Sequence, residues 1–237
     1  LAAGYFDGDA YCDLAIGVTG EDVGEFTNLG AVHVLYASAD AFAPPAGDWI
    51  WTRNDIEMAG EPQNDASFGR ALAAGDFDND GQDDLAIGTP YDNVSGNADA
   101  GSVHVMYGGL SNGLSDWGDR VWYQGSYINT LVEANDRFGW SLTTGDVDGD
   151  GYDDLVIGTP YEDIKDPETG GDIVDAGMIQ VFYGEDGGIP DQPRYQNFHQ
   201  DKGSIGNTAE SDDRFGMSVA VLRATPCNVF LPLVIRQ

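Results

Sequence analysis

Acidic residues alternate with other residues in two short stretches of this chain. Residues 76–84 read DFDNDGQDD, and residues 146–154 repeat the pattern as DVDGDGYDD. Carboxylates this close repel one another and resist ionising unless a cation lies among them. Calcium suits such a cluster, because this hard divalent ion takes about 6–8 oxygen ligands from carboxylates, backbone carbonyls and water. The spacing therefore predicts two calcium-binding loops.

Each predicted loop offers four aspartate side chains and one backbone carbonyl to the metal. Gly81 stands at the sharp turn of the first loop, where glycine reaches a positive φ without strain. Gln82 is expected to donate the backbone carbonyl, and Tyr152 occupies the same position in the second loop. The expected ligands are Asp76, Asp78, Asp80, Gln82 and Asp84 in the first loop, and Asp146, Asp148, Asp150, Tyr152 and Asp154 in the second.

An EF-hand loop opens in the same way and is the obvious alternative. That motif requires a bidentate Glu at the twelfth position and a helix on both sides. The twelfth residue from Asp76 is Ile87, and the twelfth from Asp146 is Ile157. The run Leu85–Gly88 that follows the first loop is short and apolar, which is typical of a buried strand. The sequence therefore excludes an EF-hand.

A third, degenerate copy of the loop stands near the start of the chain. Tyr5 replaces the first aspartate and Ala10 replaces the glycine. The loss of a carboxylate should weaken metal binding, so a third calcium site is left open here. Its ligands would be Asp7, Asp9, Tyr11 and Asp13.

Composition narrows the classes of fold and partner. The 237 residues include 33 glycines but only 10 lysines and arginines together, which favours a turn-rich β protein. A hydrophobic content of 41% supports a real core. The formal net charge of −31 argues against binding to nucleic acid phosphates. No apolar run is long enough to span a membrane.

Two cysteines, Cys12 and Cys227, provide neither a disulfide framework nor a zinc-binding spacing. Whether they pair with each other is left open. The chain enters in mid-repeat at Leu1, so the lack of a signal peptide says nothing about secretion.

Internal repetition decides the expected fold. Each predicted loop is followed by an alternating apolar strand and then by an aromatic segment, so each unit contains four short strands with the metal loop between the first and second. Four-stranded units repeated around an axis are propeller blades. The units expected are a partial blade at 1–65, two blades with intact loops at 66–135 and 136–212, the first strand of a further blade at 213–222, and a tail outside the repeat at 223–237.

The repeated order Phe-Gly, D-x-D-x-D-G-x-x-D, Leu-Ala-Ile-Gly-Thr-Pro and G-x-V-x-V-x-Y resembles the FG-GAP repeat. That repeat builds the propellers of integrin alpha subunits and occurs in many secreted bacterial proteins. The resemblance covers residues 1–222; Thr89 and Thr159 depart from it, standing where the family name has Ala. It implies an all-β propeller with blades of four antiparallel strands, calcium on the lower face, and partners on the opposite face or the side.

Three blades and a fraction are too few for a closed ring, since propellers have about 4–8 blades. An open arc would leave apolar sheet faces in water. We expect the remaining blades to come from sequence before Leu1, and the alternative is that a second chain completes the ring.

No constellation of residues in the sequence requires catalysis. The best-placed carboxylates are already assigned to metal, and the repeated His33 and His104 lie within strands, where packing explains them. We therefore predict a calcium-stabilised extracellular scaffold that binds a protein or carbohydrate partner in adhesion or surface recognition. The alternative is the accessory or catalytic propeller of a secreted hydrolase or lyase that acts on glycans or lipids.

Overall fold

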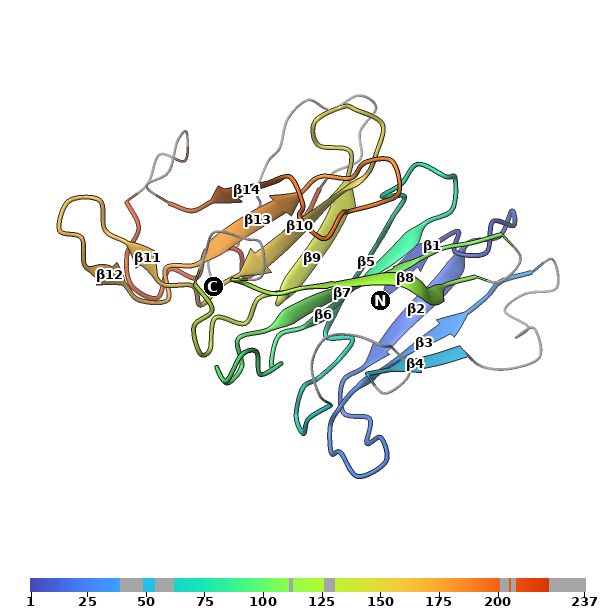
Figure 1. Cartoon of the computed structure of the whole chain (residues 1–237), viewed down its shortest axis with the longest axis horizontal. Coiled ribbons are helices and arrows are strands. Elements are labelled where there is room, and N and C mark those ends of the chain that lie inside the picture. Colours follow the sequence, from blue (N-terminus) through green and yellow to red (C-terminus); the bar gives the residue numbers. More distant parts are fainter. Residues whose placement is uncertain are drawn as a thin grey trace.

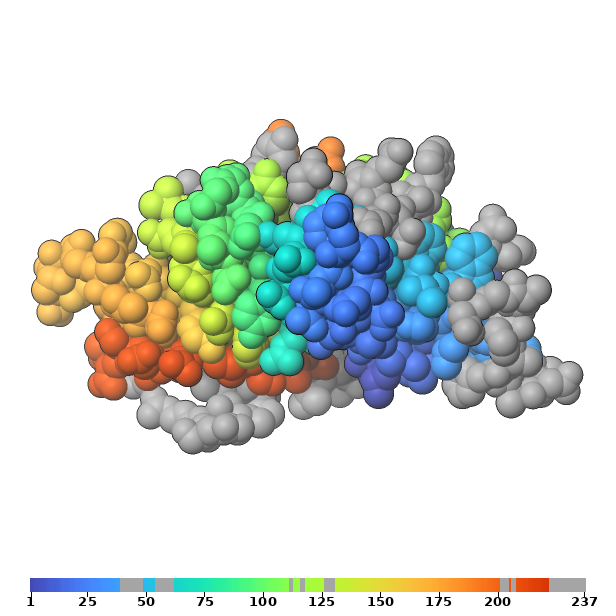
Figure 2. Space-filling view, turned by 90° about the horizontal axis from the view of Figure 1, so that it is seen from below, coloured from blue at the N-terminus to red at the C-terminus, as the bar shows by residue number. Residues whose placement is uncertain are grey.

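The computed structural model describes residues 1–38, 49–53, 62–110, 113–125, 131–200, 205 and 208–221. These residues form strands, turns and loops, and no α-helix occurs among them. Three four-stranded antiparallel sheets lie side by side in the order of the sequence and do not close into a ring (Figure 1). The space-filling view shows the same order, with colours running from orange at one end through green to blue at the other (Figure 2).

Each sheet is a simple meander in which consecutive strands pair. The first contains β1 (Ala2–Gly4), β2 (Asp13–Val18), β3 (Ala31–Leu35) and β4 (Trp49–Thr52). The second contains β5 (Ala71–Gly75), β6 (Asp84–Thr89), β7 (Ser102–Tyr107) and β8 (Ser115–Trp122). The third contains β9 (Ser141–Gly145), β10 (Asp154–Thr159), β13 (Met178–Phe182) and β14 (Tyr195–Phe198). A small hairpin, β11 (Ile164–Lys165) and β12 (Asp172–Ile173), is inserted in the third unit.

This architecture confirms the prediction of an all-β fold with blades of four antiparallel strands in an incomplete ring. The exact blade boundaries stay a prediction. Residues 213–221 contribute one isolated bridge, between Phe215 and Gly177, so the further blade is also still a prediction. The tail at 223–237 and Cys227 lie outside the described residues, and the pairing of Cys227 with Cys12 stays open.

The hydrophobic core lies between the sheets. One cluster joins the first and second sheets through residues such as Val32, Phe68 and Ile87. A second cluster joins the second and third sheets through residues such as Val105 and Phe138. Because the middle sheet is covered on both faces, β6 is buried at every position. The continuous apolar run after the metal loop is thus the run expected of a strand without a solvent face.

Close backbone contact between neighbouring sheets explains why the repeat contains so many glycines. The glycine in the second strand of each sheet faces the glycine of the next Phe-Gly pair. A Cβ added at Gly17, Gly88 or Gly158 would lie 2.0, 2.2 or 2.1 Å from the carbonyl oxygen of Gly69, Gly139 or Gly216, respectively. A side chain at these positions would force the sheets apart, so glycine is required for their approach.

Candidate metal centre

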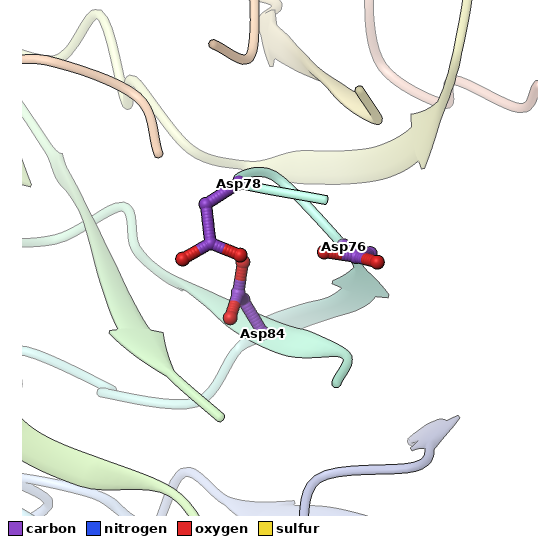
Figure 3. Close-up of side chains that lie close together, drawn as sticks. All are labelled: Asp76, Asp78 and Asp84. Atoms are coloured by element: carbon purple, nitrogen blue, oxygen red, sulfur yellow. The ribbon is translucent and has the colours of Figure 1, made fainter. Parts of the chain in front are cut away.

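Three aspartates meet in the loop that joins β5 to β6. Oxygens of Asp76, Asp78 and Asp84 all lie within 4.8 Å of one another. Figure 3 shows the carboxylates of Asp78 and Asp84 directed toward each other, with Asp76 across the loop. Three oxygens at this separation can ligate one cation, and calcium accepts ligands of this kind.

The loop between β9 and β10 repeats the arrangement. Here the carboxylate oxygens of Asp146, Asp148 and Asp154 lie within 4.8 Å of one another. The two groups occupy equivalent places, at the same end of neighbouring sheets, because the first strand of each sheet ends where the loop begins. The sequence repeat therefore produces two equivalent oxygen clusters.

The last aspartate of each loop is buried and doubly bonded to the backbone. Oδ2 of Asp84 accepts a hydrogen bond from the amide of Phe77 at 2.9 Å, and Oδ1 accepts one from the amide of Gly108 at 2.9 Å. Burial raises the pKa of Asp84 to about 8, although these two amides favour its charged form. A cation at the cluster would stabilise the ionised carboxylate.

Asp154 occupies the same environment in the third sheet. It accepts hydrogen bonds from the amides of Val147 at 2.8 Å and Gly184 at 3.1 Å. Burial raises its pKa to about 7. Each of these carboxylates therefore ties its own loop to the end of the third strand of its sheet, independently of any metal.

Backbone amides of the loop hold the two remaining members of the first cluster. Asp76 accepts from the amides of Asp80 and Gly81, both at 3.1 Å, and Asp78 accepts from the amide of Asp80 at 3.1 Å. Burial is the main cause that raises the pKa of Asp76 and of Asp78, and Asp80 contributes to both shifts. The oxygens are thus pre-positioned, at the expense of repulsion that a cation would relieve.

Asp80 and Asp150 were also expected to be ligands, but the structure does not bring them into these two clusters. Oδ1 of Asp80 accepts from the amide of Gln82 at 2.9 Å, and Oδ1 of Asp150 accepts from the amide of Tyr152 at 3.1 Å. Their predicted coordination, and that of the Gln82 and Tyr152 carbonyls, stays a prediction.

Arg194 is a neighbour of the second cluster that the sequence did not reveal. Its Nη2 lies 2.6 Å from Oδ2 of Asp148 and 3.5 Å from Oδ2 of Asp150, and its guanidinium stacks over Tyr183 at 4.2 Å. Arg194 lies just before β14, far from the loop in sequence, so no local spacing pointed to it. A cation bound here would have to share Asp148 with this guanidinium.

The degenerate first loop keeps the buried aspartate but does not gather three acids. Asp13 accepts from the amides of Phe6 at 3.0 Å and Ala37 at 2.8 Å, and burial raises its pKa to about 6. Asp7 accepts from the amide of Asp9 at 3.0 Å. Among the described residues no three-acid cluster includes these aspartates, and exposed Tyr11 lies beside them.

Neighbouring metal loops are joined by reciprocal hydrogen bonds. The amide of Asp153 donates to the carbonyl of Asp76 at 2.9 Å, and the amide of Asp76 donates to Oδ2 of Asp153 at 3.1 Å. Tyr5 and Asp83 make the corresponding pair, at 3.1 and 2.8 Å. The first position of one loop is therefore attached to the residue before the last aspartate of the next.

A separate buried polar network lies between the first and second sheets. The Arg53 guanidinium is 2.5 Å from Oδ2 of Asp92 and 3.1 Å from Nε2 of His104. Ser102 Oγ donates to Asp92 at 2.7 Å and lies 3.0 Å from the same histidine nitrogen. Burial and then Arg53 lower the pKa of His104 well below its usual value. Ser102, His104 and Asp92 thus form a buried polar group that contacts Arg53.

Comparison with known proteins shows that the chain carries FG-GAP repeats. The model of the FG-GAP repeat matches residues 68–106 and 138–182. Integrin alpha-PS2 of Drosophila melanogaster is 32% identical over 196 residues, which cover 78% of this chain and 11% of that protein. Integrin alpha-5 of Xenopus laevis is 29% identical over 195 residues, covering 81% of this chain and 16% of that protein.

A relative of another kind matches equally well. Phosphatidylinositol-glycan-specific phospholipase D of Mus musculus is 33% identical over 156 residues, which cover 65% of this chain and 17% of that protein. The chain thus spans less than a fifth of each of these relatives. The likeness to secreted bacterial proteins stays a prediction. In the part of the chain that is described, no helix is long and apolar enough to cross a membrane.

Proposed function

We propose that this chain, which carries FG-GAP repeats and is related to the integrin alpha subunits, acts as a calcium-stabilised extracellular scaffold that binds a partner in adhesion or surface recognition. The observation that carries the proposal is the pair of three-aspartate clusters at equivalent ends of neighbouring sheets. Carboxylates this close repel one another unless a cation lies among them, and two copies at equivalent positions make an accidental grouping a poor explanation.

Calcium is the cation that fits these clusters. The ligand atoms are carboxylate oxygens, which hard cations prefer, and calcium completes its shell with carbonyl and water oxygens. Extracellular modules bind calcium with dissociation constants of about 10⁻⁴–10⁻³ M, and such weak sites fill only outside the cell. Integrin relatives support an extracellular location and a role in which the rigid sheets present loops to a protein or glycan.

Calcium titration of the purified chain tests this proposal. We expect binding of two calcium ions by isothermal titration calorimetry, with a rise in the midpoint of thermal unfolding that a chelator abolishes. Magnesium at the same concentration should stabilise less, since it demands a small octahedral site. A chain that melts at the same temperature in calcium and in chelator would contradict the proposal.

The second candidate is an accessory or catalytic propeller of a hydrolase that acts on glycans or lipids. The similarity to phosphatidylinositol-glycan-specific phospholipase D favours it. Incubation of the chain with a glycosylphosphatidylinositol-anchored protein separates the two. A scaffold releases none of the anchored protein, whereas release by the purified chain would establish the enzymatic alternative.

The three described sheets do not close a ring, and we propose that blades from further sequence of the same polypeptide or from a second chain complete it. Light scattering distinguishes these sources, since a ring completed by two chains has twice the mass of one. A monodisperse folded monomer would exclude the two-chain ring.

A further inference from the structure

Three arginines and three aromatic rings pack together at the end of the sheets opposite the metal loops. Arg70 and Trp140 directly precede β5 and β9, the strands that run from this end to the metal loops. Tyr91 and Tyr161 lie two residues after the ends of β6 and β10. We call this group, which consists of Arg70, Tyr91, Arg137, Trp140, Tyr161 and Arg214, the arginine ladder.

Cation–π contacts run without a gap along the ladder. The Arg70 guanidinium carbon is 4.8 Å from the Trp140 ring centroid, and that of Arg137 is 5.6 Å from the same centroid. The guanidinium carbon of Arg137 also lies 4.3 Å from the Tyr161 ring centroid. That of Arg214, which comes after β14, lies 5.1 Å from the same centroid. The rings of Trp140 and Tyr161 meet edge to face at 5.8 Å. Such contacts hold each planar guanidinium in one orientation.

The ladder concentrates positive charge in a very acidic protein. Three of the 10 lysines and arginines gather here, against a net charge of −31. Within the described part of the chain neither Arg70 nor Arg137 forms an ion pair, and Arg214 only reaches Asp212 at 3.5 Å. Asp175 is close enough for Arg214 and Arg137 to lower its pKa, although burial raises it more. With 41 acids in the chain, unpaired arginines point to an anion from outside.

Carboxylate is an anion that suits this geometry. A guanidinium held flat against a ring still presents its N–H edge, and this planar fork matches the two oxygens of a carboxylate. The cations come from successive repeats and are separated by one aromatic ring each, so the surface itself has a repeating character. A ligand that repeats one carboxylate in every unit would meet these guanidiniums in turn.

We propose that the arginine ladder is a docking surface for an acidic glycan whose sugar units carry carboxylates, a uronic-acid polymer. A polymer with one charge for each sugar is favoured over a denser polyanion, because the rest of the surface is strongly acidic. The proposal rests on the scaffold function above and names its partner, at the end of the sheets that the metal loops leave free. In this proposal the metal clusters take no part in binding the glycan.

Binding of short oligogalacturonates to the full chain in calcium tests the proposal, with a neutral galactose oligomer of the same length as the control ligand. We expect binding of the acidic oligomer only. Arg137→Gln should weaken binding about tenfold, since one charge-assisted hydrogen-bonding group is lost. Arg70→Gln, at the exposed end of the ladder, should weaken binding about threefold.

Arg120→Gln is the matched control, because it removes the same charge from β8, where Arg120 pairs with Asp191 at 2.9 Å. We expect its affinity to equal that of the unaltered chain. Should Arg137→Gln fail to fold, the exposed Arg70 decides the outcome, and circular dichroism establishes which variants are folded.

Three results would overturn the proposal. They are equal binding of the neutral oligomer, equal affinities of the Arg137, Arg70 and Arg120 variants, and tighter binding of oligoglutamate, which would assign the surface to an acidic peptide instead. If calcium still stabilises the chain, these results reject only the glycan surface and leave the scaffold proposal standing. Loss of calcium stabilisation rejects the scaffold proposal independently.

Discussion

The first and second sheets are built from the same repeat but differ in their metal loops. Both retain the buried last aspartate, Asp13 or Asp84, with two backbone amides bonded to its oxygens. Only the second gathers three carboxylates, because Tyr5 stands where the second loop has Asp76. The difference separates two roles of the last aspartate. It ties the loop to the sheet in both blades and joins a three-acid cluster in only one.

The two sheets also differ in how far they are covered. β2 in the first sheet alternates between buried and partly buried positions at its start, whereas every position of β6 is buried. The cause is position in the stack, because the second sheet has a neighbour on both faces and the first has a described neighbour on one. Nearly the same strand sequence therefore produces different burial.

Removal of the last aspartate should have the largest effect. Asp84→Ala leaves two amides without their acceptor, and we expect a loss of about 3 kcal/mol in the free energy of unfolding in chelator. Asp13→Ala should lose a similar amount, although its loop has no cluster. Urea denaturation measures both. If Asp13→Ala left the free energy of unfolding unchanged, the hydrogen bonds from the two backbone amides to Asp13 would contribute nothing to stability.

Loss of a cluster member should act only when calcium is present. Calcium at about 100 times its dissociation constant stabilises a one-site protein by about 2.7 kcal/mol, and Asp78→Asn should remove most of that contribution from its loop. Asp7→Asn, the equivalent change in the first loop, should have a small effect in both conditions. Thermal unfolding with and without chelator checks this. Equal losses in chelator and in calcium would argue against a metal role for Asp78.

Stability without calcium should fall as the pH rises. Burial raises the pKa of Asp84 to about 8 and that of Asp13 to about 6, both above the ordinary value near 4. The folded state therefore keeps protons that the unfolded state has lost, so the contribution of these two groups to stability is greatest below pH about 4 and declines up to the folded pKa. The decline due to Asp13 should end near pH 6 and that due to Asp84 near pH 8.

Urea denaturation in chelator across this range measures the pH dependence. Asp84→Asn should flatten the curve at its upper end, and saturating calcium should flatten it in the unaltered chain by favouring the ionised carboxylate. A stability that rises from pH 5 to pH 8 in chelator would contradict the assigned pKa shifts.

Repair of the first loop should give the smallest effect. Tyr5→Asp together with Ala10→Gly restores the pattern of the second loop, and the backbone contacts of Tyr5 with Asp83 do not depend on its side chain. We expect one additional calcium ion in a calorimetric titration and a gain of about 1 kcal/mol at calcium a few times the dissociation constant. An unchanged stoichiometry would mean that more than these two residues separates the loops.

Local spacing predicted much of this protein. Alternating apolar residues indicated the strands, and the spaced aspartates indicated loops in which Asp76, Asp78 and Asp84 come together, because both patterns depend on residues that are near one another in the chain. The EF-hand was excluded on the same grounds. These features require no knowledge of how one sheet lies on another.

The tertiary structure alone decided the remainder. The hydrogen bond that the Gly108 amide donates to Asp84, the approach of Arg194 to Asp148 and the ladder around Arg137 join residues from different strands or different repeats. Such contacts depend on the stacking of sheets through the facing glycines and the shared core. Local sequence determines which residues each sheet presents, but the packing between sheets determines which of them meet.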